Sequence, residues 1–275
     1  MSTILQRPAA DGSIVVTPES AGWRYVGFEA LDLAPGAAVA RETGGRETCV
    51  VVISGTVHVR SAHGEWRDLG GREDPFSGPP EGAYLPPGTA YEVEGAGSSP
   101  AEIGLCHAPA SKGTTARPLR SAEVTTRGYD VHERLVGNVM MANEDAERLL
   151  VTEVITPSGH WSSYPPHKHD VDALPTESYL EETYYHRVQP ATGFGLQRVY
   201  TDDRSLDETV AFADRDVVLV PRGYHTVAAP PGVRVYYLNV MAGPSRQWAF
   251  TDDPALAWTR AAGATLDGRL GPSAS

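Results

Sequence analysis

The two halves of this sequence present the same order of short strand-like segments. In the first half, a β-branched run over 47–55 (ETCVVVISG) is followed by 82–88 (GAYLPPG), which ends in a Pro-Gly corner. In the second half, 181–190 (EETYYHRVQP) is followed by 216–223 (DVVLVPRG), which ends in a similar corner. The spacing between the paired segments is alike in both halves, with 35 residues from Glu47 to Gly82 and 34 from Glu182 to Asp216. Short runs closed by turns and repeated once along a chain predict two tandem antiparallel β domains.

Turn residues are abundant enough to support this interpretation. The 275 residues include 28 glycines and 22 prolines, and a chain interrupted so often favours short strands over long helices. The polar stretch 108–117 (APASKGTTAR) is the candidate linker. We therefore predict an all-β fold, with one domain over 1–110 and a second over 118–275.

Charge and cysteine content narrow the classes of function. The formal net charge is −12, and so acidic a chain repels phosphate backbones, so we expect no nucleic-acid partner. The first residues lack the apolar run of a signal peptide, and no stretch reaches the roughly 18 apolar residues of a membrane span. Cys49 and Cys106 are too few for a disulfide scaffold. We expect a cytoplasmic protein without a membrane partner.

A histidine pair in the second half indicates a metal site. His167 and His169 are separated by one residue, and on a strand residues i and i+2 point to the same face. Two neutral imidazoles on one face form half of a divalent metal site. His225 follows the second corner and offers a third imidazole. The carboxylates downstream of the pair are Glu177, Glu181 and Glu182.

The strand period leaves the choice of carboxylate open between two phases. Along 181–187, Glu182, Tyr184 and His186 share one face, whereas Glu181 and Tyr185 lie on the other. Only one of these faces can point into a barrel. Glu177 lies outside this strand, in a segment rich in proline and serine, and could fold over the site instead.

The order of these groups resembles the two metal-binding motifs of the cupin superfamily. Those motifs run from HxH through a glutamate to PxG and a last histidine, between the short strands of a small β-barrel. In that family the ligand glutamate precedes an aromatic residue by three positions, which Glu182 and Tyr185 match. The resemblance therefore implies the ligand set His167, His169, Glu182 and His225.

A narrower resemblance covers five segments of the second half densely and the first half loosely. The segments are 158–170 (SGHWSSYPPHKHD), 180–188 (LEETYYHRV), 197–210 (QRVYTDDRSLDETV), 217–232 (VVLVPRGYHTVAAPPG) and 236–248 (YYLNVMAGPSRQW). Together they are similar to the 5-deoxy-glucuronate isomerases of bacterial myo-inositol catabolism, a family of bicupins. The resemblance implies two tandem jelly-roll β-barrels, the first cupin-like without metal ligands and the second with the metal.

This family resemblance also implies a reaction. 5-Deoxy-D-glucuronate becomes 5-dehydro-2-deoxy-D-gluconate through an enediol-type intermediate, with a divalent metal as Lewis acid. We expect zinc first, with manganese or iron as alternatives. Two alternatives stay open: an iron-dependent cupin oxygenase, which would consume oxygen, and a non-catalytic module that binds a sugar acid.

The implied chemistry assigns candidate roles to residues near the motifs. Glu177, Glu181 and His186 are candidate bases, and Tyr184 is a candidate donor to a developing oxyanion. The substrate carboxylate needs a cation, for which Arg198 and Arg222 are nearest by motif position, with Tyr224 as a further donor to substrate.

The first half lacks these groups in sequence. Glu47 precedes a strand there, but no HxH lies upstream of it, and Tyr91 stands near the place of the last histidine. We expect this half to be structural, either pairing with the second barrel or building an oligomer interface, and we expect at least a dimer.

Overall fold

The chain is built almost entirely of β-strands. The computed structural model describes residues 3–120 and 122–261. Within these ranges the helices are α1 (Pro18–Ala21) and the 3₁₀ turns η1 (Asp130–His132) and η2 (Ala257–Arg260). None of the helices in the described ranges is long and apolar enough to cross a membrane. The predicted all-β fold class is therefore confirmed.

The first half forms a barrel around one long strand. Its strands are β2 (Ile14–Val16), β3 (Gly27–Leu33), β4 (Ala38–Glu42), β5 (Arg46–Ser61), β6 (Gly64–Arg72), β7 (Glu81–Leu85), β8 (Ala90–Gly95), β9 (Ala101–Pro109) and β10 (Arg117–Leu119). The first part of β5 pairs with β7 and β9, and its last part pairs with β6 and β8. Because β5 serves both faces, the sheet curls around an interior of valines such as Val50, Val52, Val57 and Val59.

The second half forms a barrel from two facing sheets and a small ribbon. Its strands are β11 (Val124–Arg127), β12 (Arg134–Met140), β13 (Leu150–Thr156), β14 (Trp161–Lys168), β15 (Asp170–Ala173), β16 (Glu177–Tyr179), β17 (Glu181–Gln189), β18 (Gly195–Tyr200), β19 (Asp207–Phe212), β20 (Val217–Val220), β21 (Tyr224–Ala228), β22 (Arg234–Ala242) and β23 (Thr251–Asp252). The seven-stranded sheet runs β1-β20-β17-β22-β13-β12-β11 and the five-stranded sheet runs β19-β18-β21-β14-β23.

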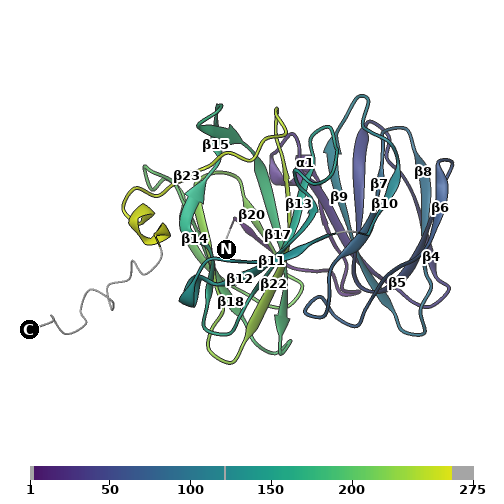
Figure 1. Cartoon of the computed structure of the whole chain (residues 1–275), viewed down its shortest axis with the longest axis horizontal. Coiled ribbons are helices and arrows are strands. Elements are labelled where there is room, and N and C mark those ends of the chain that lie inside the picture. Colours follow the sequence, from purple (N-terminus) through teal and green to yellow (C-terminus); the bar gives the residue numbers. More distant parts are fainter. Residues whose placement is uncertain (1–2, 121, 262–275) are drawn as a thin grey trace, which may run out of the picture.

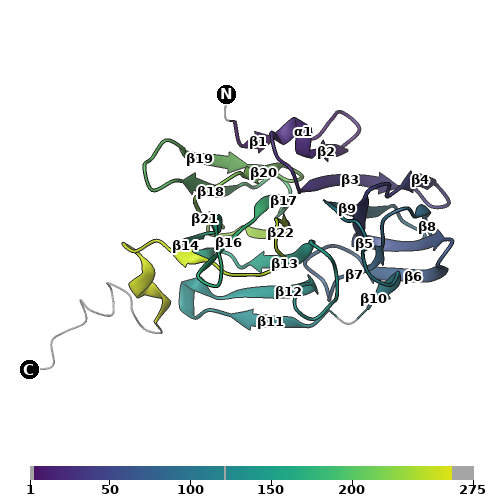
Figure 2. The ribbon, with the colours of Figure 1, turned by 90° about the horizontal axis from the view of Figure 1, so that it is seen from above.

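The two barrels lie side by side (Figures 1 and 2). Two strands pair with a different barrel from the one that their place in the sequence suggests. Strand β1 (Leu5–Gln6) begins the chain but pairs with β20 of the second barrel. Strand β10 follows the candidate linker but pairs with β7 of the first barrel. The predicted domains 1–110 and 118–275 also include 1–2 and 262–275, which lie outside the described residues. Those boundaries stay a prediction, and the crossing strands tie the two barrels together.

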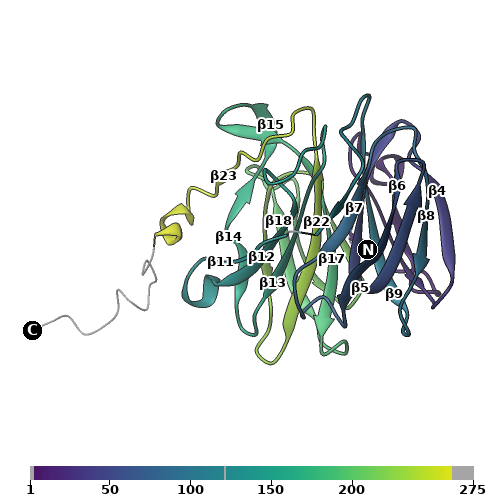
Figure 3. The same cartoon turned by 45° about the vertical axis from the view of Figure 1, so that its right-hand side comes forward.

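The strand period sorts the side chains of β17 between two cores. Tyr184 packs among the apolar residues inside the second barrel, while Tyr185 joins the core between the barrels. In that core, Tyr185 meets Phe28 of β3, with ring centroids 5.3 Å apart. Figure 3 shows the broad faces of the two barrels packed against each other. Of the two phases open in the sequence, the one containing Glu182 points into the barrel.

Candidate metal centre

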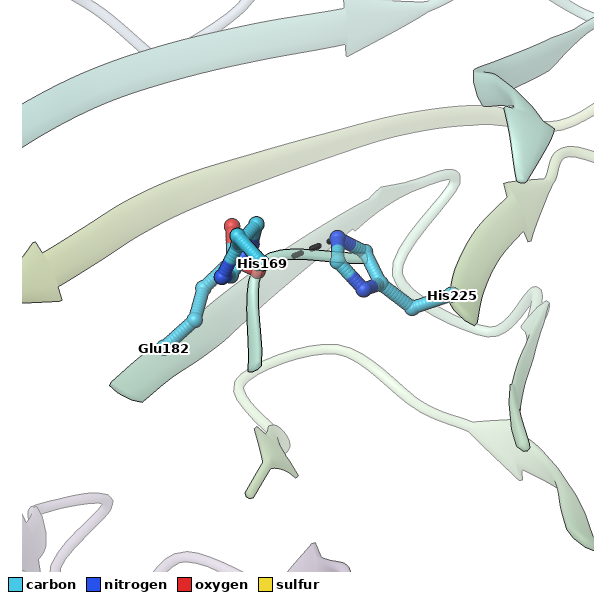
Figure 4. A group of neighbouring side chains, drawn as sticks. All are labelled: His169, Glu182 and His225. Atoms are coloured by element: carbon cyan, nitrogen blue, oxygen red, sulfur yellow. Dashed lines mark hydrogen bonds and ion pairs between the residues drawn. The ribbon is translucent and has the colours of Figure 1, made fainter. Parts of the chain in front are cut away.

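Three buried side chains converge inside the second barrel (Figure 4). His169 lies in the link between β14 and β15, Glu182 comes from β17 and His225 from β21. One ligand atom from each lies within 4.8 Å of the others, and all three residues are buried. Strand register explains the convergence, because β14 pairs with β21 through His167 and His225. The barrel thus brings together residues that are 56 positions apart.

The orientation of the rings leaves their Nε2 atoms facing the carboxylate. Nδ1 of His169 lies 3.1 Å from the carbonyl oxygen of Leu180, and Nδ1 of His225 lies 3.1 Å from that of Gly223. A carbonyl oxygen only accepts, so each Nδ1 carries the hydrogen. The Nε2 atoms then lie 3.0 Å and 3.1 Å from Oε2 of Glu182.

One of these atoms has no hydrogen-bond partner among the described residues. Nε2 of His225 is fully buried and makes no hydrogen bond, although the oxygen of Glu182 is close to it. Two imidazole nitrogens and a carboxylate around a common point form a donor set that suits a divalent cation. A bound cation would satisfy the orphaned nitrogen, so these residues fit a divalent metal.

The surroundings keep Glu182 ionised. Burial alone would raise the pKa of this carboxyl, but the adjacent imidazoles and its hydrogen bonds outweigh burial and lower the pKa to about 2. One of those bonds comes from Nδ2 of Asn239, which donates to Oε1 of Glu182. Asn239 therefore holds the carboxylate in place from the neighbouring strand β22.

His167, the fourth predicted ligand, lies beside this group but outside it. Its ring centroid is 4.7 Å from that of His225 and 6.3 Å from that of His169. Burial lowers the pKa of His167 well below its usual value, so the ring is neutral. It shares a cavity with Glu182.

That cavity carries hydroxyl groups beside the carboxylate. Oγ of Ser163 lies 3.2 Å from the hydroxyl oxygens of both Tyr184 and Tyr237, and all three residues line the wall. Ser163 has a φ of 49°, a left-handed conformation that costs a non-glycine residue about 1–2 kcal/mol. It falls in the stretch of β14 where the register with β21 shifts, and such irregularities re-aim side chains near functional sites.

Sequence comparisons place the chain among known proteins. A family model described as the KduI/IolB family matches residues 4–259. The chain belongs to the KduI/IolB family. A 5-deoxy-glucuronate isomerase of Geobacillus kaustophilus is 50% identical over 255 residues, which span 91% of this chain and 92% of that protein. The 5-deoxy-glucuronate isomerase of Bacillus subtilis strain 168 is 43% identical over 247 residues, 88% of this chain and 90% of the relative.

Solved structures agree with the two-barrel fold of this KduI/IolB family member. The crystal structure of an IolB-like protein from Salmonella typhimurium matches with a TM-score of 0.90 at 42% identity, over 94% of this chain and 99% of that one. A Bacillus subtilis oxalate decarboxylase variant matches with a TM-score of 0.61 at 13% identity, over 87% of this chain and 74% of that one. The second likeness shows the fold alone, and the predicted bicupin architecture is confirmed.

The predicted bases Glu177 and His186 lie away from the cavity. Glu177 accepts hydrogen bonds from Nζ of Lys168 at 3.1 Å and 3.2 Å and is buried in the β15–β16 ribbon. His186 lies deeper in the barrel, where it stacks on Phe212 with centroids 3.5 Å apart. Burial lowers the pKa of His186 to about 3. The predicted donor Tyr184, by contrast, lies at the cavity wall.

The three residues predicted to bind substrate also lie elsewhere. Arg198 is exposed and forms a two-bond ion pair with Asp207, both distances being 2.8 Å. Arg222 extends to Oγ of Ser205 at 3.3 Å on the surface. Tyr224 donates its hydroxyl to Asp202 at 2.9 Å. None of these three lines the cavity that holds Glu182.

Two arginines and a tryptophan that line the cavity of Glu182 were not predicted from the sequence. Arg127, Arg134 and Trp248 border this cavity and also the adjoining one, which opens toward η1 and η2. The arginines come from β11 and β12, which carry no metal motif. Their only signal in the sequence is two basic residues in strands just after the linker. Trp248 lies beside the cluster of His169, Glu182 and His225, which we call the metal group, with its ring centroid 5.3 Å from that of His169.

Proposed function

We propose that this protein isomerises 5-deoxy-D-glucuronate to 5-dehydro-2-deoxy-D-gluconate. Relatives that carry the name 5-deoxy-glucuronate isomerase match about nine-tenths of the chain. The observation that carries the proposal is the convergence of His169, Glu182 and His225 on one point beside a cavity lined by hydroxyls and arginines. Such a combination suits a small polyhydroxy acid better than an apolar ligand.

The metal of the proposal is divalent, with zinc expected first and manganese or iron as alternatives. His169, Glu182 and His225 would hold it, with His167 as the fourth ligand. When bound, a divalent cation supplies Lewis-acid stabilisation of the negative charge that develops on sugar oxygens during isomerisation. Asn239 keeps the carboxylate oriented from behind.

The chain itself positions the sugar through its hydroxyl cluster. Isomerisation moves one hydrogen from C2 to C1 and one proton between the two oxygens. The hydroxyl of Tyr184 faces the cavity beside Ser163 and Tyr237, so we assign it the donation of a hydrogen bond to a substrate oxygen. Trp248 packs against the rings of His167 and His169 and so forms one side of the proposed site.

The test is an anaerobic NMR time course of purified protein with 5-deoxy-D-glucuronate, run with and without a chelator. The proposal expects ketose signals to grow in the absence of oxygen. They should not form in protein from which the chelator has removed the metal, and they should form again once zinc is added. The control variant is His160→Ala, which should keep wild-type turnover. His160 lies outside the cavity, and its Nδ1 contacts the carbonyl of Glu133. Unchanged substrate, with metal shown to be bound, would overturn the proposal. Turnover that requires oxygen would favour an oxygenase instead.

A further inference from the structure

Two arginines face each other across neighbouring strands at the cavity wall. Arg127 on β11 and Arg134 on β12 are direct register partners in an antiparallel pair. Like charges directly opposite each other in a sheet are destabilising. Both residues border the cavity that reaches Glu182 and also the outer cavity beside it.

Neither guanidinium has an acidic partner in the described ranges 3–120 and 122–261. Nη1 of Arg134 donates only to the carbonyl oxygen of His132 at 3.2 Å, and no side-chain bond is found for Arg127. Arg260, which also lines the outer cavity, is by contrast neutralised by Asp252. Burial lowers the pKa of Arg134, and the charge of Arg127 adds to that effect. Arg134 is half-buried and Arg127 is exposed. A partly buried guanidinium without a counter-ion, with a second cation opposite it, is a place where an anion would be stabilised.

The chemistry of the proposed substrate supplies such an anion. A hexuronic acid carries an aldehyde at C1 and a carboxylate at C6, so a site that holds the aldehyde end near Glu182 needs cations further along the cavity. Guanidinium groups match a carboxylate with two parallel hydrogen bonds. We propose that Arg127 and Arg134 together bind the substrate carboxylate and thereby select uronic acids over neutral sugars. This inference rests on the proposed function for the identity of the acid.

The pair also explains how the substrate would be oriented. Trp248 borders both cavities, so its indole lies along the path between the metal group and the arginines. An apolar indole surface between the metal group and the arginines would pack against the C5 methylene, which distinguishes a 5-deoxy sugar from an ordinary uronic acid. Anchoring the far end fixes which carbonyl reaches the metal group.

The experiment compares Arg127→Gln and Arg134→Gln with wild type in the full-length, metal-loaded protein. Two readouts are measured: kcat/KM for 5-deoxy-D-glucuronate and for its neutral analogue with a C6 alcohol, and calorimetric binding of borohydride-reduced substrate. The reduced acid keeps the carboxylate but cannot isomerise. Arg234→Gln is the control, because Arg234 carries the same charge in the same sheet, bonds to Gln189 and borders neither cavity.

The inference expects each variant to lose about 10–100-fold in kcat/KM for the acid and in affinity for the reduced acid. The neutral analogue should react as in wild type, which also shows that the variants fold. Arg127→Lys and Arg134→Lys should fall between, since lysine keeps the charge but loses the paired bonds.

The outcomes separate this inference from the function on which it rests. Turnover of the acid by wild type, with unchanged affinity in both glutamine variants, overturns the carboxylate subsite and leaves the isomerase standing. A similar loss in Arg234→Gln overturns the subsite as well. Absence of turnover in wild type, with binding of the reduced acid still dependent on both arginines, overturns the isomerase and supports the subsite.

Discussion

The two barrels have the same strand register but different side chains at the positions that matter for chemistry. In the second barrel, Glu182 pairs with Val220, the last residue before the corner Pro221-Arg222-Gly223. In the first barrel, the residue before the corresponding corner is Leu85, and its partner is Thr48. Thr48 is therefore the counterpart of Glu182. Glu47, which precedes a strand as the ligand glutamate would, corresponds instead to Glu181.

The histidine positions differ in the same way. His167 pairs with His225 across β14 and β21, and the corresponding pair across β4 and β8 is Glu42 with Ala90. Glu42 is exposed, and Ala90 offers no ligand atom. The same β framework thus exists with and without the cluster of two histidines and a glutamate. The fold depends on strand pairing and apolar interiors, whereas the proposed metal binding depends on a few side chains that only the second barrel carries at these positions.

Where the barrels agree, the shared feature is a structural one. Oxygens of Glu47 accept hydrogen bonds from the backbone N–H groups of Glu147, Arg148 and Leu149, just before β13. Oxygens of Glu181 accept from those of Arg24, Tyr25 and Val26, just before β3. Each buried glutamate therefore binds the entry to the matching strand of the other barrel. This reciprocal pair joins the two halves.

The largest effect should come from giving the second barrel a residue of the first. His225→Ala reproduces Ala90 and removes one of the proposed ligands. We expect loss of bound metal and a fall in turnover of about 10³-fold, since metal stabilisation of transition-state charge is worth several kcal/mol. Metal analysis by mass spectrometry and the NMR assay measure both. Glu42→Gln in the first barrel is the control, and metal loss in that variant would contradict the comparison.

The shared glutamates should matter for stability in both barrels alike. Glu47→Gln and Glu181→Gln each replace a carboxylate that accepts three backbone bonds by an amide with one acceptor oxygen. We expect each to lower the free energy of unfolding by about 3 kcal/mol, because hydrogen bonds to charged groups contribute about 1.5–3 kcal/mol each. Urea unfolding measures the change. If only one of the two variants lost stability, the two glutamates would not join the barrels in the same way.

The sequence predicted the fold because its determinants are local and repeated. Short β-branched runs, Pro-Gly corners and the period of two determine the strands. Alternation along 181–187 groups Glu182 with Tyr184 on one face, and the cupin resemblance selects that face as the inner one. The convergence of three of the four predicted metal ligands was predictable for a related reason. His169, Glu182 and His225 each lie at a strand end or corner whose position the motif fixes.

The other site residues depend on information that a motif does not contain. Arg198 was selected by its closeness to the motifs, but on β18 it occupies the outward phase, with Gln197 and Val199 buried on either side. That alternation was visible in the sequence. The sequence did not reveal that β11 and β12 approach the cavity of Glu182, because this approach depends on how the seven-stranded sheet curls. Arg127 and Arg134 are therefore found only in three dimensions.

A finer exchange should weaken the metal site without removing a ligand. Asn239 faces Tyr184 across β17 and β22, and the corresponding residue opposite Val50 is Leu105. Asn239→Leu preserves shape but takes away the amide that donates to Glu182. We expect metal affinity to fall about 10–100-fold, as for other groups that orient metal ligands. Competition with a chelating dye measures the affinity. Leu105→Met is the control, and equal effects would contradict the assignment.

The smallest effect is a change in the pH dependence of stability that is due to a buried histidine of the first barrel. Nδ1 of His107 lies 2.9 Å from Oγ1 of Thr48, the counterpart of Glu182. Burial, helped by the charges of Arg46 and Arg41, lowers the pKa of His107 to about 3. The unfolded chain, with a pKa near 6.5, then binds the proton more readily, so stability is full above pH 6.5 and falls as pH drops toward 3. Between pH 7 and 5.5 the loss due to His107 should be about 1 kcal/mol.

His107→Gln isolates this contribution, because glutamine can still bond to Thr48 but does not titrate near neutral pH. Urea unfolding of wild type and variant at both pH values gives the difference directly, and contributions from other groups such as His186 cancel in the comparison. We expect the variant to lose about 1 kcal/mol less than wild type over this interval. Equal losses in the two proteins would mean that His107 is solvated in the folded state. The first barrel would then be open to water at the position where the second barrel carries His169, Glu182 and His225.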